Sequence, residues 1–476
     1  MKKKVLVTLA GMLLFAAPAM AVEVPPGVAV PAAPAYNCDY QPSCEVAPGV
    51  YGKMASPVTS KFNLSIGGFV ELQYAYNSQN MGANGFVFPG APGGGLYTQG
   101  FDQYAQRQSQ FSARTSRFWL KVAGPTFLGA KTNSLIEADF LGSNQGANEV
   151  GNLRLRHAYG SLDWANTQVL FGQYTDIFGP AFAATVDFRH GAVTGTPNNP
   201  RVPQFRLTQK VNFNDANYLK LVLGVQNAVQ ENINTAGFQS GGDVPNVAGQ
   251  IMFVSKALGV APGAYGFSLN SLQAGFFGLW GTQKVLIDNP NISRQHNVDV
   301  YGYGFYAFVP LVKSSDGKSR AMTASLETQA YISAGINWDG ANASTKLFAT
   351  AASATAPTGL SSSTQSLNGG SAAKGYGAYG QLIFFPTQDV GITAGYARRN
   401  AMNYGAFAND EPFEQYNEMI YGNVSYDLNA AVRVMAEYMH GKTQYSAPLT
   451  TSAGVPVGTQ DFGQLNAARV SLLYFF

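Results

Sequence analysis

Residues 62–77 read FNLSIGGFVELQYAYN, and the character of the side chain changes at nearly every step along this stretch. The apolar members are Phe62, Leu64, Ile66, Val70, Leu72, Tyr74 and Tyr76, and the polar members are Asn63, Ser65, Glu71, Gln73 and Asn77. Successive side chains of a β-strand point to opposite faces, so a period of two indicates a strand. We expect one face of this strand to be apolar and the other polar.

The same alternation recurs along the chain and predicts sixteen strands. They fall at 61–77, 107–123, 130–141, 152–163, 167–174, 203–212, 217–228, 247–257, 271–282, 297–309, 320–336, 374–386, 389–399, 415–427, 430–442 and 462–476. An even number of strands is typical of a single-chain bacterial barrel. The fold class is therefore predicted to be all-β, with a transmembrane antiparallel β-barrel over residues 61–476.

The connections between these strands alternate in length, which is an independent signal. The short connections lie at 164–166, 213–217, 386–388 and 427–430, and the long ones, rich in Gly and Ser, at 78–106, 175–202, 229–246, 337–373 and 443–461. Short periplasmic turns at one end and long extracellular loops at the other are typical of outer-membrane barrels.

Composition supports a surface that faces lipid. Charged residues make up 12% of the chain, against about 25% in soluble domains, and the chain holds 25 Tyr and 31 Phe. Beyond the N-terminal segment there is no run of about 18 apolar residues, the length that a membrane-spanning helix needs. A helical membrane protein is therefore disfavoured.

The N-terminal residues are predicted to be a secretory signal peptide over 1–21. Lys2, Lys3 and Lys4 precede an apolar run and then Ala19-Met20-Ala21, a small-residue cleavage site. The whole chain holds 30 basic and 27 acidic residues, so removal of the three lysines leaves a near-neutral mature chain. Net charge indicates no partner, and no nucleic acid is expected to bind.

Residues 22–60 are predicted to be a Pro-rich periplasmic segment with little regular structure. This segment contains Cys38 and Cys44, the two cysteines of the chain, and an exported protein reaches a compartment where such a pair can form a disulfide. A metal site is the competing interpretation. The chain has four His, none near the pair, so we expect the disulfide and no metal.

The last predicted strand indicates the compartment. Ala468, Val470, Leu472, Tyr474 and Phe476 form one apolar face, and the sequence finishes on an aromatic residue. This resembles the C-terminal signal that the bacterial barrel-assembly machinery recognises. With the signal peptide, it predicts the outer membrane of a Gram-negative bacterium, where lipid is a further partner.

A barrel of sixteen strands is wide enough to enclose a water-filled channel, whereas side chains fill the interior of a barrel of about eight strands. The basic residues that alternate with apolar ones, and are therefore expected to face this lumen, are Arg117, Lys121, Arg154, Arg156, Arg206, Lys210 and Lys220. The acids expected there are Glu71, Glu137, Asp139, Glu327, Glu418 and Glu437. Two interpretations stay open: charge pairing across strands, expected for Glu137 and Asp139, or arginines that attract anions and bind carboxylates in a forked geometry.

The long connection 175–202 follows the fifth strand, where general porins fold a loop into the channel. It carries Asp176 and Asp187. If the connection folds inward, these acids would face the basic residues of the lumen. The electric field between the acids and the basic residues would select solutes by charge. Folded outward, the connection would be a surface loop.

Residues 153–180 contain the pattern Arg-x-Arg-x-Ala-Tyr followed by Gly172-Gln173, and residues 201–206 read Arg-Val-Pro-Gln-Phe-Arg. These stretches resemble the DcaP-like family of trimeric porins. The resemblance implies a homotrimer of sixteen-stranded barrels whose arginine-rich constriction passes small anions such as dicarboxylates. By that match the constriction residues would be Arg154, Arg156, Arg201 and Arg206. Family members often carry a coiled-coil-prone periplasmic helix, which the Pro-rich segment 22–60 does not match.

The predicted function is passive diffusion of small hydrophilic solutes through a porin, with no cofactor. A structural or adhesive surface barrel is an alternative, suggested by the Ala-, Ser- and Thr-rich loop 341–373. An outer-membrane barrel enzyme is another. It would need a nucleophile beside a His, and we find no such signature; His157, with Leu155 and Tyr159, is expected on the lipid side.

Overall fold

The computed structural model describes residues 62–79, 107–142, 151–186, 201–227, 244–289, 292–335, 374–402, 414–445 and 461–476. The predictions for the signal peptide, for segment 22–60 with Cys38 and Cys44, for Asp187 and for loop 341–373 lie outside these residues. Within the described residues, no helix is both long enough and apolar enough to cross a membrane.

Strands make up nearly all of the described chain. They are β1 (Asn63–Asn77), β2 (Gln108–Ser112), β3 (Arg117–Ala123), β4 (Lys131–Asp139), β5 (Arg154–Asp163), β6 (Thr167–Thr175), β7 (Arg201–Asn212), β8 (Asn217–Gln226), β9 (Asn246–Pro262), β10 (Leu269–Asn289), β11 (Ile292–Val312), β12 (Thr323–Ala334), β13 (Lys374–Phe385), β14 (Val390–Ala401), β15 (Glu414–Asp427), β16 (Val432–Tyr445) and β17 (Phe462–Phe475). A single 3-10 turn, η2 (Ala264–Gly266), separates β9 from β10.

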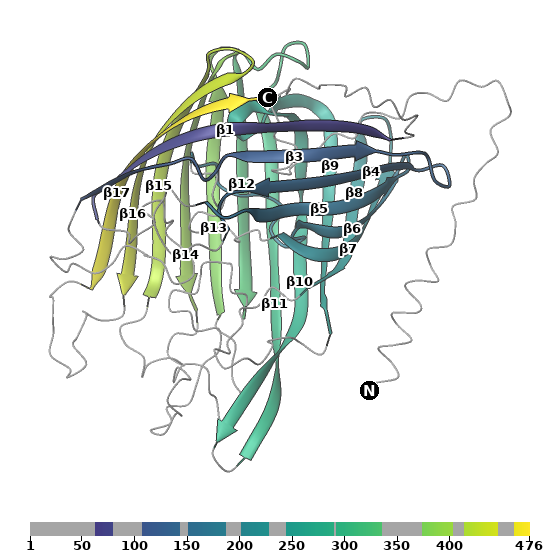
Figure 1. The fold of residues 1–476 in the computed structure, drawn as a ribbon, viewed down its shortest axis with the longest axis vertical. Coiled ribbons are helices and arrows are strands. Elements are labelled where there is room, and N and C mark those ends of the chain that lie inside the picture. The colour runs from purple at the N-terminus through teal and green to yellow at the C-terminus, as the bar shows by residue number, and fades with distance from the viewer. Residues whose placement is uncertain are drawn as a thin grey trace. The chain divides into compact units, whose positions relative to one another are not determined.

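These strands close into one antiparallel barrel. Each strand from β3 to β16 pairs with the next along the chain, and β17 pairs with β1, with Phe69 opposite Phe475. Both β2 and β3 pair with β1, so the seventeen segments occupy sixteen strand positions around the barrel. Figure 1 shows the strands curving round side by side, with β1 next to β3. Closure gives the backbone N–H and C=O groups at every strand edge a hydrogen-bond partner, which lipid cannot supply. The predicted fold class and strand number are confirmed.

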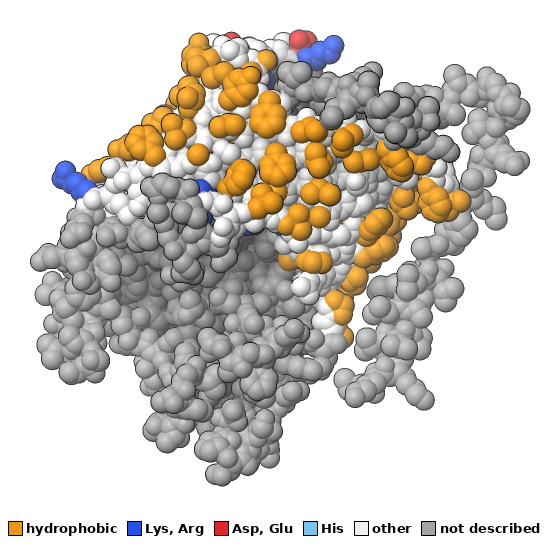
Figure 2. All heavy atoms as spheres, in the orientation of Figure 1, with side chains coloured by type: hydrophobic (Ala, Val, Ile, Leu, Met, Phe, Trp, Pro, Cys, Tyr) orange, Lys and Arg blue, Asp and Glu red, His pale blue; other side chains and the backbone are white. Residues whose placement is uncertain are grey.

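The two faces of the wall differ as the alternation predicts. At the seam between β1 and β17, Val70 is 56% exposed and Leu472 47%, whereas Glu71 and Ser471 between them are fully buried and hydrogen-bonded to each other at 2.5 Å. Figure 2 shows apolar side chains spread over the outward face of the strands, with Lys and Arg along its margins. Apolar groups therefore meet lipid, and polar groups meet the lumen or one another.

The sorting of connections by length holds in the structure with one exception: β10 and β11 pair as far as Asn289 and Ile292, so only residues 290–291 join them at the long-loop end. The strand ends joined by 124–130, 164–166, 213–216, 263–268, 313–322, 386–389 and 428–431 lie at one end of the barrel. The short turns are closed by local hydrogen bonds. In one of them, Asn214 accepts the backbone N–H groups of Ala216 and Asn217 at 3.0 and 2.9 Å, an arrangement for which asparagine is suited.

The expectation that Glu418 faces the lumen is wrong. Glu418 lies two residues from Ile420, which is 59% exposed, and therefore shares the outward face of β15. There its carboxylate pairs with Arg398 at 3.2 Å and accepts a hydrogen bond from Tyr396 at 2.8 Å. This group sits near the long-loop ends of β14 and β15, above the apolar band, where an outward side chain reaches polar surroundings.

Candidate functional site

A β-bulge concentrates charge on the inner face of β5. Glu137 of β4 is opposite His157, but its neighbour Ala138 is opposite Leu155, so Arg156 is the extra residue. The extra residue exchanges the inward and outward positions of β5 on one side of the bulge relative to the other. As a result Arg154, Arg156 and His157 all contact inward-facing acids of β4.

Two acids of β4 join three arginines from both neighbouring strands. Asp139 accepts two hydrogen bonds from Arg154, at 2.9 and 2.6 Å. Arg156 bridges the two acids, at 2.5 Å to Glu137 and 2.8 Å to Asp139, and Arg117 lies 3.2 Å from Glu137. The cross-strand pairing predicted for these two acids is therefore present, and it holds the arginines in fixed positions.

The prediction that His157 and Tyr159 face lipid is wrong, because the bulge shifts the parity of β5 at this point. His157 is fully buried, with Nδ1 2.7 Å from a carboxylate oxygen of Glu137 and Nε2 3.1 Å from the hydroxyl of Thr175. The Tyr159 ring packs edge-on against the inward Tyr174, with centroids 4.8 Å apart. Leu155 stays outside.

Arg206 of β7 extends this group of arginines toward β6. Its guanidinium donates to the side chain of Gln204 at 3.0 Å and to the carbonyl of Thr175 at 2.7 Å, and it lies 4.9 Å from the Tyr174 ring. The contacts hold Arg206 where the chain leaves β6 for the long connection.

Two more arginines belong to the group by electrostatic proximity. Arg201 interacts with Arg156, Arg154, Arg117 and Glu137. Arg114 interacts with Arg154 and Asp139. We call Arg114, Arg117, Arg154, Arg156, Arg201 and Arg206 the arginine cluster. Among the described residues it outnumbers the acids that interact with it, Glu71, Glu137, Asp139 and Asp176. Pattern reasoning missed Arg114, because it lies in the interruption between β2 and β3 where the alternation fails.

The lysines predicted to belong to the same group of lumen-facing basic residues lie farther along their strands. Lys121 is four residues beyond Arg117 on β3, and Lys210 four beyond Arg206 on β7, which is about 13 Å along a strand toward the short turns. Lys210 is directly opposite Lys220, with its ammonium 5.5 Å from the Tyr218 ring. The predicted basic residues therefore divide into the arginine cluster near the long-loop end and lysines farther toward the periplasmic end, of which Lys121 still interacts electrostatically with Glu137.

The connection after β6 turns into the lumen. Residues 176–186, which we call the inner segment, are hydrogen-bonded to inward side chains of many strands. The backbone N–H groups of Ala181, Ala184 and Val186 donate to Gln329, Gln381 and Glu437, and the carbonyls of Ile177, Ala184 and Val186 accept from Gln250, Asn423 and Gln73. These partners lie on β12, β13, β16, β9, β15 and β1.

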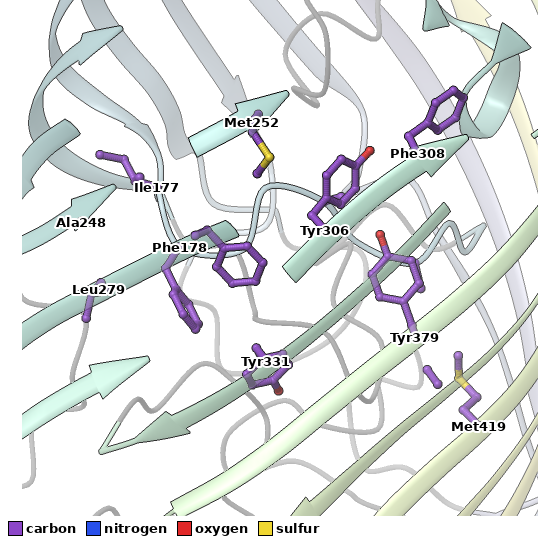
Figure 3. Packing of buried hydrophobic residues seen from close by; sticks show 14 of the residues in the cluster. Ile177, Phe178, Ala248, Met252, Leu279, Tyr306, Phe308, Tyr331, Tyr379 and Met419 are labelled. Atoms are coloured by element: carbon purple, nitrogen blue, oxygen red, sulfur yellow. The ribbon is translucent and has the colours of Figure 1, made fainter. Parts of the chain in front are cut away.

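Apolar contacts add to these hydrogen bonds. The Phe178 ring lies 5.1 Å from that of Phe277 and 6.0 Å from that of Tyr331, in edge-on contacts. Figure 3 shows Ile177 and Phe178 among side chains that come from β9 to β15. The inner segment therefore follows the inside of the wall from β8 to β16, which we call the covered wall. Its last residues, Ala184 and Val186, reach an apolar cluster that includes Phe69 of β1, Trp119 of β3 and Leu135 of β4.

Asp176, the first residue of the inner segment, is buried but is not bound directly to an arginine. Its carboxylate accepts hydrogen bonds from the side chain of Gln226 and, at 3.2 Å, from the backbone N–H of Phe178, with Arg206 near enough to interact electrostatically. Asp176 thus turns the chain from β6 toward β8.

The closed barrel, its lipid-facing exterior and its charged interior define the porin fold of the Gram-negative outer membrane. Residues 101–252, which include the whole arginine cluster, match the model of the DcaP outer membrane protein family. The resemblance to that family is confirmed. No curated protein sequence matches the chain.

Two solved structures show the same fold. The outer membrane channel DcaP of Acinetobacter baumannii is 17% identical, with a TM-score of 0.61, and the alignment covers 88% of this chain and 99% of that one. The anion-selective porin from Comamonas acidovorans is 12% identical, with a TM-score of 0.51, and the alignment covers 87% and 100%. This chain is an outer-membrane β-barrel with the architecture of these proteins.

Proposed function

We propose that this barrel is a porin through which small hydrophilic solutes diffuse passively, with a preference for small anions. The observation that carries the proposal is the excess of arginines over acids on the inner face from Arg114 to Arg206, among the described residues. A guanidinium stays charged at any physiological pH and can bind a carboxylate through two hydrogen bonds. Dicarboxylates are the solutes that such spaced arginines suit best.

The related structures support this proposal. One is described as an outer membrane channel and the other as an anion-selective porin. By analogy we also propose a homotrimer of non-enzymatic barrels, a state that chemical cross-linking in outer membranes would test through a threefold increase in mass. Phe476 exchanges two backbone hydrogen bonds of 3.1 Å with Gly68, so the residue expected to engage the assembly machinery also closes the barrel.

The decisive experiment is the reversal potential in a salt gradient, measured on purified protein in planar bilayers. We expect wild-type channels to favour chloride over potassium, and the double variant Arg154→Ala, Arg206→Ala to lose much of that preference. Arg398→Ala is the matched control, because Arg398 lies on the outward face. Cation preference in the wild type, or an equal shift in the control, would refute the anion assignment.

A hydrolase is a second candidate, because Glu137, His157 and Thr175 form a hydrogen-bonded chain like that of catalytic triads. We favour a positioning role for it. His157 is fully buried, Thr175 is nearly so, and the Thr175 carbonyl also accepts hydrogen bonds from Arg206 and Gln204. The chain of contacts therefore fixes the point where the inner segment begins.

A further inference from the structure

The periplasmic connection between β9 and β10 leaves the line of the wall. Ser271 is opposite Val260, but the next residue, Leu272, is opposite Ser255, so residues 256–259 form a large bulge on β9. Gly259 has φ of +76°, a backbone conformation that residues with a Cβ rarely adopt. The bulge redirects the chain, and we call residues 256–268 the periplasmic flap.

Beyond the bulge, the periplasmic flap lies against the strands that follow β10. The Val260 carbonyl accepts the backbone N–H of Ser314 at 2.7 Å, and the Pro262 carbonyl accepts the hydroxyl of Ser325, a fully buried inward residue of β12, at 2.8 Å. The flap thus extends over β11 and β12 rather than connecting its own two strands by the shortest route.

The far end of the flap reaches β16 and β17. Phe267 lies 6.2 Å from Phe475 between ring centroids, and the Arg433 guanidinium lies 4.5 Å from the Phe267 ring. Tyr265, at the tip, is in the same apolar cluster as Met435 and Leu473. The flap therefore extends from β9 to β17, and the apolar cluster that holds its tip also includes Phe69 of β1, Trp119 of β3 and Leu135 of β4.

Tyr265 connects the flap to the inner segment. Its hydroxyl donates a hydrogen bond to the carbonyl of Thr185, its side chain is only 4% exposed, and its φ of 61° is in the left-handed region. A bulky residue keeps such a backbone only where the surroundings determine it strongly. Here the hydroxyl contact and the packing of the ring do so, which points to a positioning role.

Thr185 lies between two residues of the inner segment that are hydrogen-bonded to the wall. Ala184 before it is held by Gln381 at 2.8 Å and Asn423 at 2.7 Å, and Val186 after it donates to Glu437 at 2.7 Å. Tyr265 adds support from the periplasmic side at the same point. The inner segment is therefore fixed laterally by the wall and from below by the flap.

We propose that Tyr265 sets the width of the solute passage by fixing the inner segment through Thr185, so that flap and segment together exclude solutes from the covered wall. The proposal rests on the proposed porin function and adds a size-determining residue to it. The arginine cluster determines which charge is favoured, and Tyr265 determines how large a solute can pass.

The test compares Tyr265→Phe and Tyr265→Ala in the full-length protein, with Tyr303→Ala as the matched control on the outward face of β11, where Tyr303 is 57% exposed. The readouts are single-channel conductance and the size of the largest polyethylene glycol that reduces it. Since pore diameter governs both, we expect a conductance increase of roughly half for Tyr265→Ala, a higher size limit, and a smaller effect for Tyr265→Phe.

Unchanged conductance and size limit in Tyr265→Ala channels would overturn the proposal. If Tyr265→Ala does not assemble, Tyr265→Phe decides, because it loses only the hydroxyl contact and retains the ring; no change there, relative to the wild type, would equally overturn it. The two proposals fail separately. Absence of anion preference in the wild type would refute the anion-porin assignment, while the size limits would still report on Tyr265.

Discussion

The inner face of the barrel has two regions in which polar side chains find their partners in different ways. On β3 to β7, arginines pair with two acids of β4 and outnumber them among the described residues. On the covered wall, amide side chains such as Gln329, Gln381 and Asn423 bind the backbone of the inner segment. Both arrangements satisfy polar groups that face away from lipid.

The difference follows from hydrogen-bonding capacity. An amide has both a donor and an acceptor, so it can bind the N–H and the C=O of a chain laid against it, as Gln381 and Asn423 do for Ala184. A guanidinium offers donors alone, so it holds acids and draws anions but cannot bind backbone N–H groups. The amides of the covered wall therefore bind both the N–H and the C=O groups of the inner segment, whereas guanidinium groups can bind only its carbonyls.

The largest expected effect is the loss of Arg156, which bridges Glu137 and Asp139 from a buried position. Arg156→Ala leaves both acids short of a partner, and removing one member of a buried charge pair costs about 3–5 kcal/mol. We expect a loss of that order in the free energy of unfolding, measured by urea titration in detergent or bilayers. Arg398→Ala, on the outward face, is the control and is expected to cost less than about 1 kcal/mol. Equal losses would contradict the contrast between interior and exterior.

A smaller effect is expected on the covered wall from Gln381→Leu. The change removes the acceptor of the Ala184 N–H and of the Tyr421 hydroxyl and the donor to Glu327. Unsatisfied buried groups cost about 1–3 kcal/mol, and a detached inner segment should also increase conductance. Gln464→Leu, outward on β17, is the control. A Gln381→Leu channel with wild-type conductance would show that the wall does not hold the segment.

The smallest effect is expected from Thr175→Val, which keeps the shape of the side chain and removes the hydroxyl that contacts His157. We predict a loss of about 1 kcal/mol in unfolding free energy, with ion preference close to that of the wild type. Assay of ester hydrolysis in the same preparations separates the two candidate functions. Wild-type hydrolysis that disappears in Thr175→Val would favour the enzyme over the porin.

Most of the fold follows from the sequence because lipid and water impose a strict period of two on every strand. The stretch around Val70 and Glu71 and the final residues before Phe476 show this plainly, and the structure places them as expected. Periodicity fails where the register changes. The bulge at Arg156 moved His157 to the interior, and the break around Arg114 concealed an arginine that belongs to the cluster.

The contacts of the inner segment and of the flap could not be predicted. They join residues far apart in sequence, such as Tyr265 and Thr185, through single hydrogen bonds that leave no periodic signal. The sequence left open whether 175–202 folds inward or outward. Residues 176–186 fold inward, because amide side chains of several strands converge on their backbone.

The central claim is that solutes pass along the arginine cluster and not along the covered wall. Cysteine accessibility tests it most directly, with Lys121→Cys on β3 and Ser325→Cys on β12, each in a Cys38→Ser, Cys44→Ser background. A negatively charged thiol reagent should reduce current through Lys121→Cys channels and leave Ser325→Cys channels unaffected. Rapid block of Ser325→Cys with no effect on Lys121→Cys would contradict the account.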